Sequence, residues 1–375
     1  MGAIDTAILI GPAGFLIGLA FGAVGQLSGF CAMGALSDVV FLEDWRRLRS
    51  WMLALAVALA GSQGLHAAGV VDLGRSVWLA SPPSWGGAAL GGLMFGVGMT
   101  LAGGCGAKTL IRLGAGNLKS LVVALATGLV AMMTLKGLLA PLRLGLERLT
   151  ALGAAPALPA LLADEGLPAA ASRGLPVVLI GGGLAWWCLK DLEFRRSPSA
   201  LLGGLATGLL IPAGWAATGL LGDDPFAPVA PTSLSFAAPI GGALIWLMTF
   251  TGATLSFGVA AVGGTVAGAF AAAALTRQWR LEGFADTPDL LRHLAGAALM
   301  GAGGVLALGC TVGQGLTGVS TLAPLSLLAL AAIIAGSLST LICLETGGLA
   351  ACLKALRRRS PHTPGHPRSG TGCAG

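Results

Sequence analysis

Apolar runs of about 20 residues recur along the whole chain, and they limit its fold more than any other feature. A helix of about 20 residues crosses a hydrocarbon layer about 30 Å thick, because each residue adds about 1.5 Å. Hydrophobic residues make up 55% of the sequence, charged residues only 10%, and the mean hydropathy is +0.84. The sequence therefore predicts an all-α integral membrane protein, and 375 residues suit a single transmembrane transporter domain.

The apolar runs predict nine transmembrane helices and two shorter segments. The expected spans are residues 7–25, 50–71, 85–104, 118–139, 175–189, 199–219, 239–261, 290–309 and 323–345. The apolar segments 27–40 and 263–275 are too short or too interrupted by glycine to cross, so we expect re-entrant half-helices there. The 61 glycines fit broken helices and closely packed helix pairs.

Lysine and arginine are divided unevenly between the expected loops. With the N-terminus outside, most of the 22 basic residues fall on the inner side. This bias predicts a periplasmic N-terminus and a cytoplasmic C-terminus. The first apolar run lacks a basic segment before it, so it is expected to be a span and not a cleaved signal. The net charge of +6 is then a topology signal, and no nucleic-acid partner is expected.

Two segments resemble each other in the two halves of the chain. A shift of 205 positions aligns Cys105 with Cys310. It also aligns Gly96 with Gly301, Gly98 with Gly303, Leu101 with Leu306, Ala102 with Ala307 and Gly104 with Gly309. The expected helix before Cys105 runs inward and the one before Cys310 runs outward, which predicts pseudo-symmetric inverted repeats, a transporter feature. A separate upstream alignment places Ala267 opposite Cys31.

The repeat suggests a division within the one domain. The first repeat half is residues 1–140 and the second is residues 235–350. Residues 141–234 form an outer loop and linking helices, and residues 351–375 form a cytoplasmic tail.

The segments GGCG and LGCT place a cysteine where a broken helix restarts. Such a start presents unpaired backbone N–H groups and the positive end of the helix dipole, which together favour an anion. Flanking glycines, here Gly104, Gly106 and Gly309, let an anion approach the backbone. The cysteine could be a nucleophilic thiolate or a neutral S–H donor. A dianionic cargo favours the neutral donor.

Several polar residues near these cysteines have two interpretations each. Lys108 and Arg112 could attract an anion or extend to the inner surface. Thr311 and Gln314 could donate to an oxyanion or cap the second half-helix. Gln26, just before Cys31, has the same ambiguity.

Three stretches carry a resemblance to a known family. GFCAMGALSD at 29–38, LAGGCGAKTLIRLGAGNLKS at 101–120 and ALMGAGGVLALGCTVGQGLTGVSTLAPLS at 298–326 resemble the signature segments of the YeeE/YedE family of bacterial inner-membrane proteins. The resemblance implies uptake of thiosulfate or a related sulfur anion through an hourglass-shaped monomer. It also implies that Cys31, Cys105 and Cys310 line the path, with Cys31 at the outer end, although the span count alone places residues 27–40 nearer the inner face unless they re-enter. Leu308 stands where glycine is more usual in the family.

An enzyme is not expected, and neither is a cofactor or a metal. The three cysteines lack the close pairing of a zinc site, and the phosphate-loop pattern of an ATP-driven motor is missing from the sequence. The rival hypothesis is a membrane sulfurtransferase, in which Cys105 or Cys310 becomes a persulfide and passes sulfur to an acceptor. The expected partners are a small sulfur anion, membrane lipid and a cytoplasmic sulfur-carrier protein.

Overall fold

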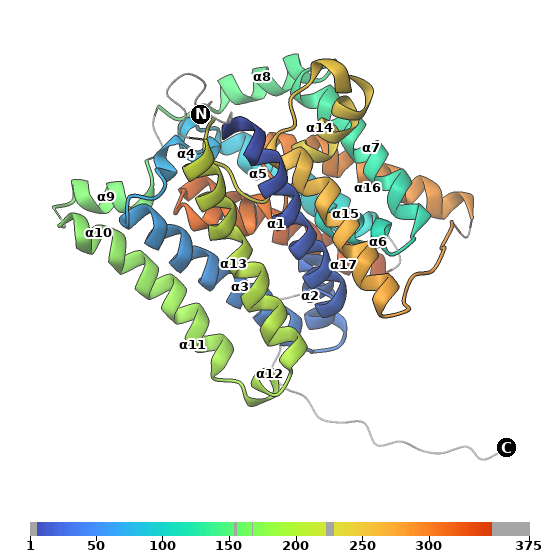
Figure 1. Ribbon diagram of the computed structural model, residues 1–375, viewed down its shortest axis with the longest axis horizontal. Coiled ribbons are helices and arrows are strands. Elements are labelled where there is room, and N and C mark those ends of the chain that lie inside the picture. The colour runs from blue at the N-terminus through green and yellow to red at the C-terminus, as the bar shows by residue number, and fades with distance from the viewer. Residues whose placement is uncertain (1–5, 154–155, 167, 223–228, 285, 347–375) are drawn as a thin grey trace, which may run out of the picture.

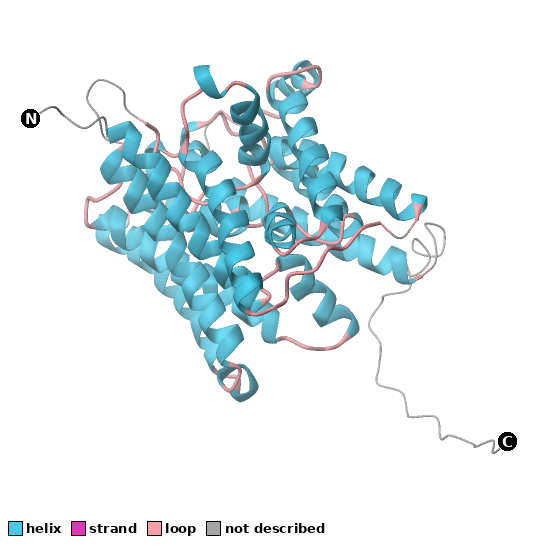
Figure 2. Cartoon of the chain, turned by 45° about the vertical axis from the view of Figure 1, so that its right-hand side comes forward, coloured by secondary structure: helices cyan, strands magenta, loops and turns pink. Residues whose placement is uncertain are grey.

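The computed structural model describes residues 6–153, 156–166, 168–222, 229–284 and 286–346. Over these residues the regular structure is all helical, joined by loops and without strands (Figure 2). This confirms the all-α fold. The expected cytoplasmic tail, 351–375, lies outside the described residues.

The helices have the following bounds in chain order. They are α1 (Thr6–Ser28), α2 (Ala32–Phe41), α3 (Arg46–Ala67), η1 (Leu73–Arg75), α4 (Val77–Ala80), α5 (Trp85–Leu101), α6 (Gly106–Gly114), α7 (Leu118–Leu135), α8 (Ala140–Leu149), α9 (Leu158–Asp164), α10 (Ala169–Pro176), η2 (Val177–Gly182), α11 (Gly183–Leu189), α12 (Leu192–Arg195), α13 (Pro198–Leu221), α14 (Ala237–Met248), η3 (Phe250–Gly252), α15 (Phe257–Leu275), α16 (Thr287–Leu306), η4 (Gly313–Gly318) and α17 (Pro324–Glu345).

Within the described residues, seven helical segments are long and apolar enough to cross a membrane. They are Leu9–Phe41, Trp85–Gly114, Leu118–Leu135, Ala171–Leu189, Pro198–Leu221, Phe257–Leu275 and Pro324–Glu345. The helices α3 and α16 have 22 and 20 residues but are not among the seven. The chain is thus a multi-pass membrane protein, and the count of nine spans stays a prediction.

The sequence-based assignment is wrong between residues 237 and 275. In place of the expected span 239–261, the structure has the short helix α14, which ends at Met248. The expected half-helix 263–275 belongs to the 19-residue helix α15. The Thr249 hydroxyl donates to a carbonyl one turn back (2.8 Å), and the Ser256 side chain caps the new helix. The short helix of the second half is therefore α14, whereas the expected segment 27–40 does contain the short helix α2.

The long helices pack crosswise between the two halves of the chain. Helix α1 packs on α13 and α15, and α3 also packs on α13. Figure 1 shows α1, α13 and α15 side by side. Helix α5 packs between α16 and α17, and α16 also packs on α7. Neither half therefore buries its apolar surface without the other.

Glycine makes the closest helix contacts possible. A Cβ atom added at Gly268 of α15 would overlap the carbonyl oxygen of Leu19 in α1, and one at Gly22 would overlap that of Thr265. Gly91 and Gly303 allow the same close approach of α5 and α16. Helices that associate in a membrane use small residues in this way, because lipid supplies no hydrophobic force between them.

Candidate functional site

Each of the three predicted cysteines lies where a short helix begins. Cys31 caps α2, and its Sγ accepts a hydrogen bond from the backbone N–H of Gly34 (3.4 Å). Cys310 begins the turn into η4, and its Sγ accepts from the N–H of Gly313 (3.4 Å). Cys105 directly precedes α6. The prediction of broken helices that restart at these cysteines is confirmed for the backbone.

The chain reaches Cys105 and Cys310 through the same backbone turn. After α5 and after α16, three successive N–H groups bond to carbonyls in an identical pattern, shifted by 205 positions. In each turn the middle one of the three donor residues has a left-handed backbone conformation: Gly103 (φ 71°) in the first and Leu308 (φ 57°) in the second. Glycine adopts this conformation freely, whereas leucine does so with strain.

Replacing Leu308 by glycine is expected to stabilise the protein by about 1 kcal/mol, because a non-glycine residue in this conformation costs about 1–2 kcal/mol. The Leu308 side chain is 38% exposed and lines a hollow, so its removal costs less packing than that of a fully buried leucine. Thermal unfolding of the detergent-purified protein measures the effect. Leu306→Gly, at the helical end of α16, should instead lower the melting temperature. A lower melting temperature for Leu308→Gly would contradict the strain argument.

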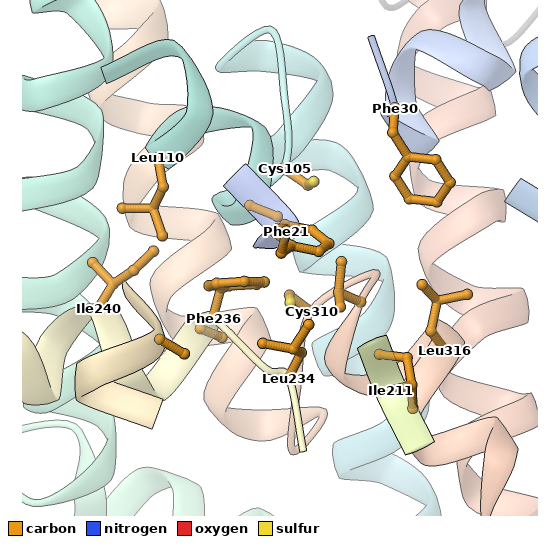
Figure 3. Close-up of a cluster of buried hydrophobic side chains, with 14 of the residues drawn as sticks. Phe21, Phe30, Cys105, Leu110, Ile211, Leu234, Phe236, Ile240, Cys310 and Leu316 are labelled. Atoms are coloured by element: carbon orange, nitrogen blue, oxygen red, sulfur yellow. The ribbon is translucent and has the colours of Figure 1, made fainter. Parts of the chain in front are cut away.

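The three thiols form one group in the protein interior. The side chains of Cys31 and Cys105 are neighbours, Cys105 is also next to Thr311, and Cys310 is within electrostatic range of Cys105. Cys105 and Cys310 are buried, and Cys31 is half-buried. Figure 3 shows the ring of Phe21 between Cys105 and Cys310, with Phe236 next to Cys310; the centroids of the two rings are 5.2 Å apart. Three helix starts thus meet in the protein interior, and helix starts favour an anion.

Two polar atoms beside this group lack a partner among the described residues. The hydroxyl of Thr311 is buried and makes no hydrogen bond of normal geometry, although Cys105 is its neighbour. The Oε1 atom of Gln314 is also buried and unpaired, while its Nε2 donates to the carbonyl of Ala307. Buried polar groups are nearly always satisfied, so these two atoms are available to a ligand.

Hollows lie on two sides of the thiol group. One has a volume of about 130 Å³ and is lined by Leu308, Gln314 and the Arg143–Glu147 ion pair (2.7 Å) of α8. The other has a volume of about 600 Å³ and includes Lys108 of α6. We call the larger one the basic vestibule. Its lining residues are Gln26, Arg47, Lys108, Arg112, Ala115, Asn117, Lys119, Gln278, Arg280, Glu282, Asp289, Arg292 and His293.

The predicted supporting residues lie in two places, beside the cysteines and in the basic vestibule. Gly104, Gly106 and Gly309 are buried beside the cysteines, and Thr311 and Gln314 follow Cys310. The other three predicted residues line the basic vestibule. Lys108 is half-buried, Arg112 donates to the Gly103 carbonyl (2.7 Å), and Gln26 donates to Gln278 (3.3 Å).

Sequence reasoning missed part of the vestibule. Arg47, Arg280 and Arg292 were counted only as topology charges, yet they share this cavity with Lys108. They come from α3, from the segment after α15 and from α16. Their convergence depends on tertiary packing, and their clustering in short polar segments was the only available signal.

The sequence matches the sulphur transport family over residues 27–339, a range that includes all three cysteines. A thiosulfate transporter TsuA from Escherichia coli is 27% identical over 322 residues, covering 81% of this chain and 86% of the relative. A thiosulfate transporter TsuA from Spirochaeta thermophila is 27% identical over 337 residues, covering 84% and 93%. Together with the apolar helices and the buried thiols, this match shows a membrane transporter and not an enzyme: the chain belongs to the sulphur transport family.

Proposed function

We propose that this protein carries thiosulfate, or a closely related sulfur anion, across the bacterial inner membrane along the path between the two hollows. The observation that carries the proposal is that three helix starts, each at or just after a cysteine, come together in the protein interior. The names of the two relatives support the choice of anion. The thiols and the backbone N–H groups of these helix starts attract an anion without holding it through a full opposite charge, as conduction requires.

The thiols act as neutral donors in this proposal. A thiolate would repel a dianion at contact distance, whereas an S–H group donates a weak hydrogen bond. Cys105 is a neighbour of Cys31 and of Thr311, the residue that follows Cys310, so it is the middle step. The terminal sulfur or an oxygen of the anion passes from one thiol to the next without a covalent bond.

The direction of transport follows from the charge distribution. Basic residues gather at the end of the molecule that carries Arg47, Lys108 and Arg292. The positive-inside rule assigns this end to the cytoplasm. Cys31 lies on the vestibule side, next to Lys108. In this orientation the anion meets Cys310 first and Cys31 last, which reverses the sequence-based expectation of Cys31 at the outer end.

The same 205-position shift extends beyond the two cysteine turns. It relates α2 to α14, α3 to α15, α5 to α16 and α7 to α17 within a few residues, and α1 corresponds to α13 with an offset of about 12 residues. The packing pairs agree, since α3 packs on α13 as α15 packs on α1, and α17 packs on α5 as α7 packs on α16. We infer one inverted repeat, in which the partner of Cys31 is Phe236 and not Ala267. The proposed path is then asymmetric at Cys31, because the equivalent position of the other repeat carries Phe236 and no thiol.

Uptake by the purified protein in lipid vesicles tests the proposal. Thiosulfate labelled on both sulfur atoms should enter with the two labels in equal amounts. Accumulation of only the terminal sulfur on the protein, without entry of the other label, would instead favour the sulfurtransferase. Delivery to a soluble sulfur carrier would follow uptake, and such a carrier should not be needed for uptake into vesicles.

Thr311→Val is expected to raise the KM for thiosulfate about 10-fold or more, since it removes a hydrogen bond to the anion, and hydrogen bonds to a charged group contribute about 1.5–3 kcal/mol. The melting temperature should hold or rise, because the hydroxyl makes no normal hydrogen bond within the described residues. Uptake kinetics and thermal unfolding measure the two effects.

Thr317→Val is the matched control. The Thr317 hydroxyl donates to the buried carbonyl of Leu234 (2.7 Å), so its loss should lower stability by about 1–3 kcal/mol. An unchanged KM in Thr311→Val would remove Thr311 from the anion path.

A further inference from the structure

The basic vestibule is a built cavity with contributions from many parts of the chain. The end of α1 supplies Gln26, the start of α3 supplies Arg47, and α6 supplies Lys108 and Arg112. The segment after α15 and the first turns of α7 and α16 close the remaining sides. At about 600 Å³ it can hold a small hydrated anion. Its position is fixed by helices and not by loops alone.

The charges of the basic vestibule are unbalanced. Six of its lining side chains are cationic and two are carboxylates. Asp289 pairs with Lys119 (2.7 Å), Glu282 accepts from Asn117 (2.6 Å), and Arg47 pairs with Asp38 (3.1 Å). The remaining cations form no carboxylate ion pair within the part of the chain that the structure describes; they are Lys108, Arg112, Arg280 and Arg292. Cations that share a hollow without counter-charges repel one another, and an anion relieves that repulsion.

Lys108 connects the positive charge of the basic vestibule with the thiol group. Lys108 is close enough to Cys31, Cys105 and Arg112 to interact electrostatically with each of them. Arg112 is held in place by its bond to the carbonyl of Gly103, in the turn that leads to Cys105. An anion that leaves Cys31 therefore enters directly among unpaired cations.

The smaller hollow, which is lined by Leu308 and Gln314, has no unpaired cation among the described residues around it. Its arginine, Arg143, is paired with Glu147 and also donates to the carbonyl of Thr134 (3.2 Å). Under the 205-position shift, Lys108 and Arg112 correspond to Gly313 and Thr317, so the repeat supplies no equivalent charges there. An anion is therefore attracted to the vestibule side of the thiol group much more strongly than to the smaller hollow.

We propose that the basic vestibule is a second anion-binding site, which holds a divalent tetrahedral oxyanion of the sulfate type before its release. This inference rests on the proposed transport and adds to it a step that limits release. Sulfate on the vestibule side then competes with the emerging anion and slows uptake. A cell rich in internal sulfate would therefore restrict its own import of sulfur anions.

Inorganic sulfate is the probe for the binding test. Equilibrium binding of labelled sulfate is measured on detergent-purified protein, with chloride at equal ionic strength as the reference. The double variant Arg280→Gln with Arg292→Gln should weaken sulfate binding at least about 10-fold, since it removes two of the unpaired charges. Arg195→Gln with Arg196→Gln, at exposed positions of α12 and its end, is the matched control and should change binding less than about twofold.

Vesicles of one protein orientation supply the second readout. Sulfate on the vestibule side should inhibit thiosulfate uptake at a concentration at least about 10-fold lower than sulfate on the opposite side. The Arg280 and Arg292 variant should lose this difference, each rate being taken relative to that variant's own uninhibited rate. Equal inhibition from both sides, or equal weakening by the control pair, would overturn the proposal.

The binding measurement also separates this inference from the proposed function. It is repeated on Cys310→Ala, a substitution far from Arg280 and Arg292 in the proposed path. Sulfate binding that persists there supports the second site independently of transport. Sulfate binding no stronger than that of chloride in the wild-type protein would refute the second site and leave the transport proposal untouched.

Discussion

Alanine at Cys310 is expected to reduce thiosulfate uptake about 10- to 100-fold, because hydrogen bonds to a charged group contribute about 1.5–3 kcal/mol and each 1.4 kcal/mol is tenfold. The same result is expected for Cys105→Ala, since Cys105 is the middle thiol. Both side chains are small and buried, so the melting temperature should fall only slightly. Uptake into vesicles at matched protein density measures the loss.

Cys188→Ala is the control for this pair. Cys188 is also a free, buried thiol, but it packs against Leu53 and Phe194 and donates to the carbonyl of Arg49 (3.2 Å). Its replacement should leave uptake unchanged. Normal uptake by both Cys105→Ala and Cys310→Ala would refute the thiol path. Serine at position 310 should restore part of the uptake if a neutral donor is enough, and none of it if sulfur itself is required.

Alanine at Gly268 is expected to destabilise the protein by about 3 kcal/mol or more, since overpacking commonly costs about 1–3 kcal/mol and backbone cannot move aside as a side chain can. The added methyl group would overlap the carbonyl of Leu19, so α1 and α15 would have to separate. Folded yield and thermal unfolding in detergent measure the effect. The loss of uptake should parallel the loss of folded protein.

Gly263→Ala lies in the same helix and provides the comparison. A Cβ atom at Gly263 meets nothing within 4 Å, so alanine should raise stability by about 0.5–1 kcal/mol through its helix propensity. The pair differs only in what faces the methyl group. Equal effects of the two substitutions would contradict the close packing of α1 and α15.

Hydropathy was enough to predict most of the long helices, because the length of an apolar run directly sets the length of the helix. The expected span 199–219 is α13 (Pro198–Leu221), and the expected span 323–345 is α17 (Pro324–Glu345). The region 237–275 could not be assigned in this way, since small apolar residues continue on both sides of its break. The polar run around Thr249 was the available signal.

For the candidate site, the sequence predicted the cysteines but not their surroundings. The glycine-flanked motifs located the helix starts at Cys105 and Cys310, because a restart of this kind is a local property. The meeting of Arg280 and Arg292 with Lys108 depends on the packing of three distant helices. Such a contact cannot be predicted from the local sequence around any one of these residues. The roles of these side chains in transport stay predictions.

The glycine contact between α1 and α15 can form only late in the synthesis of the chain. About 230 residues separate the end of α1 from the start of α15, so synthesis at about 5–20 residues per second leaves α1 without this partner for about 10 to 50 s. During that time the small-residue face of α1 contacts lipid or the insertion machinery. A ribosome that stalls before α15 would release a chain in which α1 can pack on α13 but its glycine face stays uncovered. Such a chain is a natural substrate for membrane proteases.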